Sequence, residues 1–415
     1  MTYDTDEYTN PYKINIQLEE EEDDSNRKEV FEKGLDALLD DEHFLLLYVP
    51  KEEGVKMQII RPATNLFHRK CMVKRINEAK HIPSFYYALS HLWGLSEDNR
   101  YHWNDIKEYV DDEDGQPVKP VSMRPEKRDT LLRLLRDHPD SYWWIDVLCA
   151  RTDTPLDIMG DIYACCLECI AMIDCEPTLI PQLRVLRSVT KKVEELYRTA
   201  GGNPVTRKQI YETKGPQLLD LLDTFFQRRW WQRVWTWQEM ALPMGDVRFM
   251  AEADTHHQPQ TNSTITLNEL LGFSTMVCLM RSHVVHGDVS AMKSVARTVD
   301  SSLYEISHAR SSNLLRISGS KDRFDSLIFS LMSSSRRCYD PADYVYGVLG
   351  MMQIKIPRKT DANEVWMHLL HELGNHGELY MLGFRCIGRE HEIDLRKAKT
   401  IGEVYSKLFQ VYHAF

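Results

Sequence analysis

Short apolar runs alternate with amphipathic helical stretches between residues 40 and 255, and few folds accommodate that alternation. The strongest apolar run is YWWIDVLC, residues 142–149, which is rich in aromatic and β-branched side chains and is charged only at Asp146. Strands of this kind separated by helices predict an α/β fold, with a parallel sheet flanked by helices. The predicted strands are residues 44–50, 57–62, 84–90, 142–149, 169–175 and 247–252.

Helix signals lie between these strands. Pro125 suits a first helical turn, and the leucines within residues 131–135 form one apolar face. Thr154 followed by Pro155 predicts the start of a second helix, with Thr154 as its N-cap. Further helices are expected over residues 186–196 and 218–225 and across most of residues 261–415.

The net charge of −11 is unevenly distributed. Residues 1–28 hold nine acidic and three basic side chains, and such a self-repelling block is typical of a flexible tail. We therefore predict an acidic flexible tail over residues 1–28, an α/β domain over residues 29–260 and a mainly helical region over residues 261–415. No basic footprint of a nucleic-acid-binding protein is visible, so nucleic acid is not an expected partner.

The nine cysteines are odd in number and show no regular framework, which favours reduced thiols and a cytoplasmic location. The N-terminal residues lack the apolar segment of a signal peptide. The longest apolar runs are shorter than the roughly 20 residues of a membrane-spanning helix. The cysteine-rich stretch matches no usual zinc spacing and is interpreted as buried thiols, namely Cys165, Cys166, Cys169 and Cys175.

Common nucleotide and hydrolase motifs are absent from the sequence. No GxGxxG follows a strand, and neither GxxxxGK[ST] nor GxSxG occurs. A Rossmann site, a P-loop and a nucleophile elbow are therefore not supported. No metal and no resident cofactor are predicted.

Four stretches carry a resemblance to a known family. They are YYALSHLWG, YWWIDVLCARTDTPLDIMGDIY, RRWWQRVWTWQEMAL and SSSRRCYDPADYVYGVLGM. Their order resembles the heterokaryon-incompatibility (HET) domain of filamentous fungi over about residues 83–353. That family has a Tyr-x-Ala-Leu-Ser-Tyr-x-Trp-Gly opening, a Trp-Ile-Asp-x-x-Cys strand and an Arg-x-Trp-x-x-x-Gln-Glu segment.

The chain departs from this family pattern in two places. His91 stands where the family has tyrosine, and residues 149–152 read Cys-Ala-Arg-Thr instead of Cys-Ile-Asn-Gln. The polar stretch that follows is also shorter than in the family. If this stretch shapes a ligand pocket, the pocket differs here. Asp153 lies in the altered segment and is a further candidate for ligand binding.

The HET family is in turn remotely similar to TIR domains, which are flavodoxin-like α/β modules, some of which cleave NAD. The resemblance implies that NAD is a substrate rather than a cofactor and that Glu239 is the catalytic carboxylate. Asp146 is the second candidate, or a partner that orients a ribose hydroxyl. One carboxylate can stabilise the oxocarbenium-like ribose, because nicotinamide leaves as a neutral pyridine.

The end of the strand at residues 84–90 fits a ligand site, because ligands of open α/β sheets bind beyond the carboxyl ends of strands. Ser90 and Trp93 leave the strand at this edge, and Trp93 can stack on a flat base. Gly94 allows a ligand to approach the backbone closely. These three residues are the other candidate ligand-binding residues.

Structural roles explain the same residues equally well. Trp93 and Gly94 can form a tight core turn, and Asp146 can accept backbone N–H groups of the next helix. Glu239 can pair with one of the arginines at positions 228, 229 and 233. The tryptophans at positions 230, 231, 235 and 237 are interpreted mainly as core or interface residues.

Two functional hypotheses follow. In the first, the chain is a cell-death effector of nonself recognition that consumes NAD and must self-associate to act. In the second, the α/β domain is a non-catalytic adaptor for homotypic contacts, and residues 261–415 bind a regulatory protein. The altered Cys-Ala-Arg-Thr segment favours the adaptor somewhat.

Overall fold

The computed structural model describes residues 10–17, 24–93, 101–200, 204–253, 263–283, 290–317, 323–375 and 393–413. Eight strands form one sheet, and two short strands pair separately. In spatial order the sheet runs β10 (Thr264–Thr266), β9 (Asp246–Ala251), β8 (Glu168–Ile173), β3 (Tyr86–His91), β7 (Ser141–Ile145), β1 (Leu46–Val49), β2 (Met57–Ile60) and β5 (Val110–Asp111). The separate pair is β4 (His102–Trp103) and β6 (Val121–Ser122).

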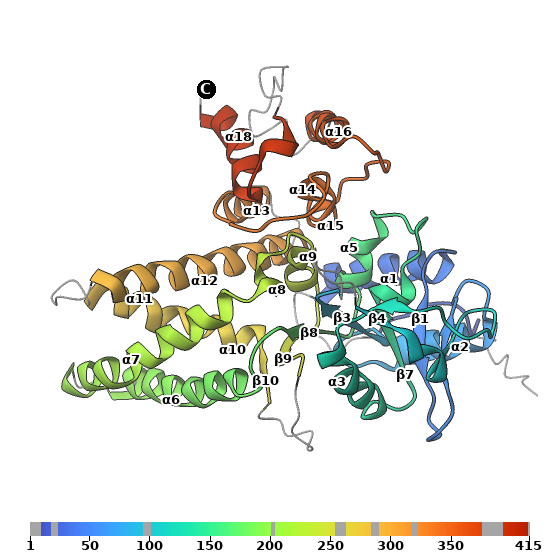
Figure 1. Ribbon diagram of the computed structural model, residues 1–415, viewed down its shortest axis with the longest axis horizontal. Helices are drawn as coiled ribbons and strands as arrows, with labels where there is room; N and C mark the ends of the chain where they lie inside the picture. Colours follow the sequence, from blue (N-terminus) through green and yellow to red (C-terminus); the bar gives the residue numbers. More distant parts are fainter. Residues whose placement is uncertain are drawn as a thin grey trace, which may run out of the picture.

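Helices surround this sheet. Those of the first part of the chain are α1 (Asp24–Asp40), α2 (Leu66–Glu78), η1 (Asn104–Glu108), α3 (Pro125–Arg136), α4 (Asp146–Cys149), α5 (Ile158–Ala164), α6 (Leu179–Ala200), α7 (Pro204–Phe226), α8 (Arg229–Gln232) and α9 (Thr236–Ala241). Figure 1 shows α3 on one side of the sheet and α1 and α5 on the other. The predicted α/β class is therefore confirmed.

The described residues after β9 are mainly helical, as predicted, and include one strand, β10. The helices here are α10 (Leu267–Leu271), α11 (Ser274–His283), α12 (Ser290–Ile317), α13 (Arg323–Met332), α14 (Asp343–Tyr346), α15 (Leu349–Met352), α16 (Ala362–Asn375), η4 (Leu395–Lys397) and α18 (Ile401–His413). Helices α11 and α12 run beside α6 and α7, and α13 to α18 form a separate layer (Figure 1). In the described part of the chain, no helix is long and apolar enough to cross a membrane.

The centre of the sheet is parallel and doubly wound. Strands β3, β7, β8 and β9 lie in this order along the chain, with the short edge strand β5 of the same sheet between β3 and β7. Within this group of four, neighbouring strands are parallel. Their spatial order is β7-β3-β8-β9, or 2-1-3-4, which is how the flavodoxin-like order 2-1-3-4-5 begins. The chain therefore winds away from β3 in both directions, and the ligand crevice of such a sheet lies at the carboxyl end of β3.

The predicted parallel sheet is found in this centre and between β2 and β5, but the other pairs of strands are antiparallel. Strand β1 is antiparallel to both β2 and β7, and β10 is antiparallel to β9. A short turn with Gly54 at φ +80° joins β1 to β2, and a connection this short leaves only the antiparallel arrangement. The result is a mixed sheet with a parallel core.

Two predicted element boundaries are also wrong. The strand predicted over residues 142–149 ends at Ile145, and Asp146 opens the one-turn helix α4 instead. The helix predicted from Thr154 begins at Ile158. The Thr154 hydroxyl accepts the N–H of Arg151 at 2.8 Å, which closes a turn before α5 rather than capping it.

The N-terminal segment is partly described. Helix α1 begins at Asp24, inside the predicted tail, and Ile16 is fully buried. The Ile16 N–H donates to Glu32 of α1 at 3.2 Å. Residues 10–17 therefore pack against the α/β part, whereas residues 1–9 and 18–23 of the predicted tail lie outside the described residues. The division of the chain near residue 260 stays a prediction.

Candidate functional site

Polar side chains mark the carboxyl end of every strand of the parallel core. They are Asp146 after β7, Ser90 and His91 at the end of β3, Asp174 after β8 and Glu252 after β9. Because parallel strands end at one edge, these side chains gather on one rim of the sheet. The rim includes the crevice position at β3, so it is the candidate functional site.

Ser90 and Glu239 meet in this rim. The buried Ser90 hydroxyl donates a hydrogen bond to the Glu239 carboxylate and accepts one from the indole N–H of Trp230 at 2.7 Å. Glu239 lies on α9 and is 6% exposed. Burial raises the pKa of Glu239 to about 7, against the opposing charge of Arg233 and the bond from Ser90. A carboxyl group in this state can serve as a base or as an anion near neutral pH.

The arginines predicted as alternative partners of Glu239 mostly bind elsewhere. Arg229 donates to Asp174 at 3.0 Å, and Arg228 donates to the carbonyl of Thr224 at 2.8 Å. Arg233 donates to the carbonyl of His91 at 3.0 Å. Of these three arginines, Arg233 is the one whose positive charge lowers the pKa of Glu239.

Asp146 accepts a backbone N–H of the next helix, as predicted, and also the side chain of Trp93. The indole N–H of Trp93 donates to it at 2.5 Å, and the N–H of Val147 donates at 2.7 Å. His91 Nε2 lies 3.1 Å from its other side. Burial opposes ionisation of Asp146, but His91 and Trp93 hold its pKa below the ordinary value. Asp146 therefore stays an anion that orients its neighbours.

The remaining predicted residues differ in their placement. Trp93 is 42% exposed, the highest exposure of the nine tryptophans, so it is not a core turn. The side chain of Asp153 is 74% exposed and lies 4.0 Å from His43. Among the described residues, it makes no hydrogen bond or ion pair with Ser90, Asp146 or Glu239. Gly94 lies outside the described residues.

The tryptophan-rich segment is mainly core, as predicted. Trp230, Trp231 and Trp237 are buried, and Trp235 is partly buried. The guanidinium of Arg336 lies 4.7 Å above the ring of Trp237. This packing fixes α8 and α9, and thereby the position of Glu239.

Lys127 and Glu252 were not predicted as site residues from the sequence, and His91 was noted only as a departure from a family pattern. Lys127 is fully buried on α3, with Nζ 2.7 Å from His91 Nδ1. Its position was detectable, because Lys127 precedes Leu131 and Leu135 at intervals of four on the apolar face of the helix. Glu252 is 4% exposed and pairs with Arg124 at 2.8 Å. Nothing in the sequence distinguishes it from a surface acid.

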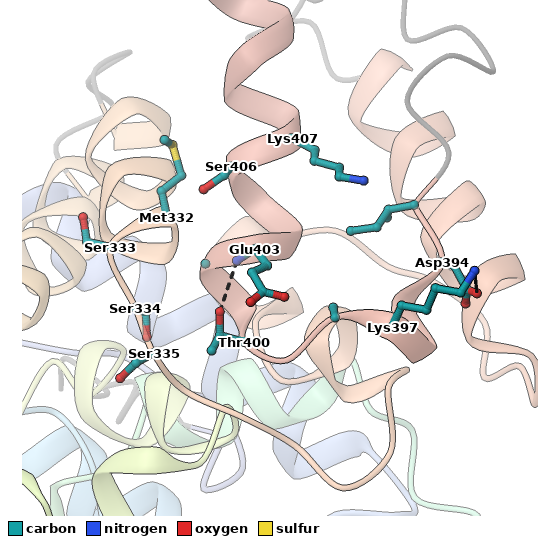
Figure 2. A pocket seen from close by; sticks show the side chains of 13 residues that line it. Met332, Ser333, Ser334, Ser335, Asp394, Lys397, Thr400, Glu403, Ser406 and Lys407 are labelled. Atoms are coloured by element: carbon teal, nitrogen blue, oxygen red, sulfur yellow. Dashed lines mark hydrogen bonds and ion pairs between the residues drawn. The ribbon is translucent and has the colours of Figure 1, made fainter.

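No metal site was found among the described residues. The cysteine-rich stretch consists of buried thiols at the end of α5, on β8 and just after it, and burial raises the pKa of the Cys175 thiol to about 12. A cavity of about 790 Å³ lies away from the rim, beside α13 and α18 (Figure 2). Two of its charged residues, Asp394 and Lys397, pair with each other at 3.3 Å.

The rim coincides with a family match. Residues 86–239 match the model of the heterokaryon incompatibility protein (HET) family. This HET region begins with the first residue of β3, ends at Glu239 and covers less than half of the chain. It confirms the predicted resemblance over a narrower span than residues 83–353. No curated protein and no solved structure matches the chain.

Proposed function

We propose that the chain is an effector of heterokaryon-incompatibility-type cell-death signalling whose HET region hydrolyses NAD. The observation that carries the proposal is the Ser90–Glu239 pair, because it places a buried, hydrogen-bonded carboxyl group at the crevice position of a flavodoxin-like strand order. The HET match supports the signalling role. The resemblance of HET to TIR domains supports the choice of NAD.

In this proposal Glu239 is the catalytic carboxylate. The bond between nicotinamide and ribose breaks, nicotinamide leaves as a neutral pyridine with the bonding electron pair, and the anion of Glu239 stabilises the oxocarbenium-like ribose. Water then attacks the ribose carbon, and its proton passes to Glu239 or to solvent. The products are nicotinamide, ADP-ribose and one proton, which balances NAD and water. A pKa near 7 suits a group that must be anionic and then accept a proton.

The other rim residues bind and orient. The exposed ring of Trp93 can stack on the nicotinamide or the adenine. Asp146 already accepts from Trp93 and Val147 and lies 3.1 Å from His91 Nε2, which fits an orienting group better than a second reacting carboxylate. Asp153 is 74% exposed, and if it binds ligand it does so outside this group.

Access to Glu239 requires a change in its surroundings, since only 6% of the residue is exposed. We place self-association of several copies before catalysis, as a step that opens the rim to the dinucleotide. A regulatory partner can act at the same step. This requirement makes protein concentration a variable of the assay.

A non-catalytic adaptor is the alternative, and one observation favours it. Ser90, Glu239 and Trp230 satisfy one another in a buried network, which is also how a structural core network behaves. In that case the α/β part is a homotypic interaction module, and the C-terminal helices bind a regulator.

Nicotinamide release from NAD tests the proposal. The purified chain is incubated with NAD at low and high protein concentration, beside Glu239→Gln and the control Glu168→Gln. Glu168 is a partly buried acid at the opposite end of β8, paired with Arg248 at 2.5 Å. Release by the chain and the control, lost in Glu239→Gln, supports an NAD hydrolase. No release from folded, self-associated chain refutes it and favours the adaptor.

A further inference from the structure

A line of four polar side chains runs from the core to the surface beside the candidate site. It starts at Lys127 on α3, whose Nζ donates to the carbonyl of Leu92 and lies 2.7 Å from His91 Nδ1. His91 Nε2 lies 3.1 Å from Asp146, and Asp146 accepts the indole N–H of Trp93 at 2.5 Å. Lys127 and His91 are buried, whereas Trp93 is 42% exposed.

The donors and acceptors along this line can be assigned. His91 Nδ1 lies 2.7 Å from Lys127 Nζ and 3.0 Å from the carbonyl oxygen of Leu92. A lysine ammonium only donates, so Nδ1 accepts from Lys127 when Lys127 is charged. The imidazole proton then lies on Nε2, which is 3.1 Å from the Asp146 carboxylate. Burial and the charge of Lys127 lower the pKa of His91, which agrees with a neutral ring. His91 thus connects a cation to an anion without carrying charge.

A histidine is needed for this connection, because its two ring nitrogens point in different directions. The HET pattern has tyrosine at this position, and a phenol has a single polar atom. Lys127 has no comparable packing role, since an apolar side chain in phase with Leu131 and Leu135 would fill the same face of α3. A buried ammonium is costly unless it is paired. Burial lowers the pKa of Lys127, and the negative charges of Glu252 and Asp146 raise it.

We infer that Lys127, His91 and Asp146 act as one relay that holds the Trp93 ring at the rim of the site. Lys127 is then a positioning residue that sets affinity for the flat base or pyridine ring of a nucleotide without touching it. The choice of ligand rests on the proposed function. The position of the Trp93 ring does not rest on the proposed function, so the choice of ligand and the position of the ring can be tested separately.

The relay is tested in Lys127→Met, with Arg136→Met as the matched control on the exposed end of α3. The first readout is acrylamide quenching of Trp93 fluorescence, taken as the difference from a Trp93→Phe version of each protein. Because loss of Lys127 frees His91 and then Asp146, quenching of Trp93 should increase in Lys127→Met and not in Arg136→Met. Unchanged quenching in folded Lys127→Met overturns the relay.

The second readout is the Kd for NAD, measured by calorimetry in the Glu239→Gln background so that NAD is not consumed. Lys127→Met should raise this Kd about tenfold or more, the effect of losing one hydrogen bond to a charged group. His91→Tyr should do the same, and the double variant should be no weaker than either single variant, because both break one relay. Additive losses overturn the relay.

The two proposals fail in different ways. If the chain binds no NAD, the proposed function fails and the quenching difference still decides the relay. If NAD binds but Lys127→Met leaves both quenching and Kd unchanged, the relay fails and the function stands. Should Lys127→Met not fold, Asp146→Ala breaks the same line next to Trp93, because alanine has no acceptor for the indole N–H. Increased quenching in Asp146→Ala supports the relay, and unchanged quenching overturns it.

Discussion

Substituting glutamine for Glu239 should stabilise the protein above neutral pH. Burial raises the pKa of Glu239 from 4.5 to about 7, a change of about 2.5 units. At about 1.4 kcal/mol per unit, ionising this group costs the folded state about 3 kcal/mol. Glutamine keeps the shape and an oxygen that accepts from Ser90, but it does not ionise.

The sign of the pH dependence follows from the raised pKa. A carboxyl group whose pKa rises on folding stabilises the folded state below its unfolded pKa. That contribution is lost as the pH rises through the folded pKa, here between about 4.5 and 7. The variant lacks this titration. Relative to the parent chain, Glu239→Gln should therefore gain about 3 kcal/mol of unfolding free energy between pH 4.5 and pH 8.

Urea unfolding at pH 4.5, 6 and 8, followed by tryptophan fluorescence, measures this gain. The matched control is Glu305→Gln, a partly buried acid that pairs with Arg336 at 3.1 Å. Removing its charge leaves Arg336 buried without an anion, so this control should lose stability at pH 8. A stability difference between Glu239→Gln and the parent chain that does not change with pH would refute the reasoning, as would a loss at pH 8.

Three further predictions concern the site and its support. If the Glu239 anion is the catalyst, kcat/KM for NAD should rise with pH through about 7. The hydrogen bond from Ser90 lowers the pKa of Glu239, so Ser90→Ala should move this rise to higher pH. The pH-rate profiles of both proteins check this. Gly350→Ala should cost about 1–3 kcal/mol of stability, because its Cβ would lie 2.4 Å from the backbone of α5, and a lowered melting temperature would show it. Arg336→Met should cost about 3–5 kcal/mol by leaving the partly buried Glu305 without its cation, as measured by urea unfolding against the exposed control Arg396→Met.

The central strands of the fold were predictable because their sequences allow no other structure. Strand β7 consists of buried residues over its whole length, and β3 and β8 are nearly so. The end of β7 was not predictable, since Asp146 stops the strand through a hydrogen bond with its own neighbour Val147. The direction of β1 was also hidden, because apolar strands of either direction have the same composition.

Half of the candidate site was predictable from motifs and half required the structure. The motifs pointed to Ser90, Trp93, Asp146 and Glu239, and the structure joins them in two pairs, Ser90 with Glu239 and Trp93 with Asp146. The sequence suggested only arginines as partners of Glu239, because its contact with Ser90 depends on how α8 and α9 pack. The buried acid Glu252 had no signal at all.

The segment between α13 and α14 supports the elements that carry Glu239. Arg337 exchanges backbone hydrogen bonds with Gln232 at 2.6 Å and Val234 at 3.1 Å, in the segment between α8 and α9. Arg336 donates to the carbonyl of Arg233 at 3.2 Å. Arg233 in turn binds the end of β3 and favours the anion of Glu239. A chain cut near residue 260 would leave these backbone groups of α8 and α9 without their partners, so the site depends on both predicted regions.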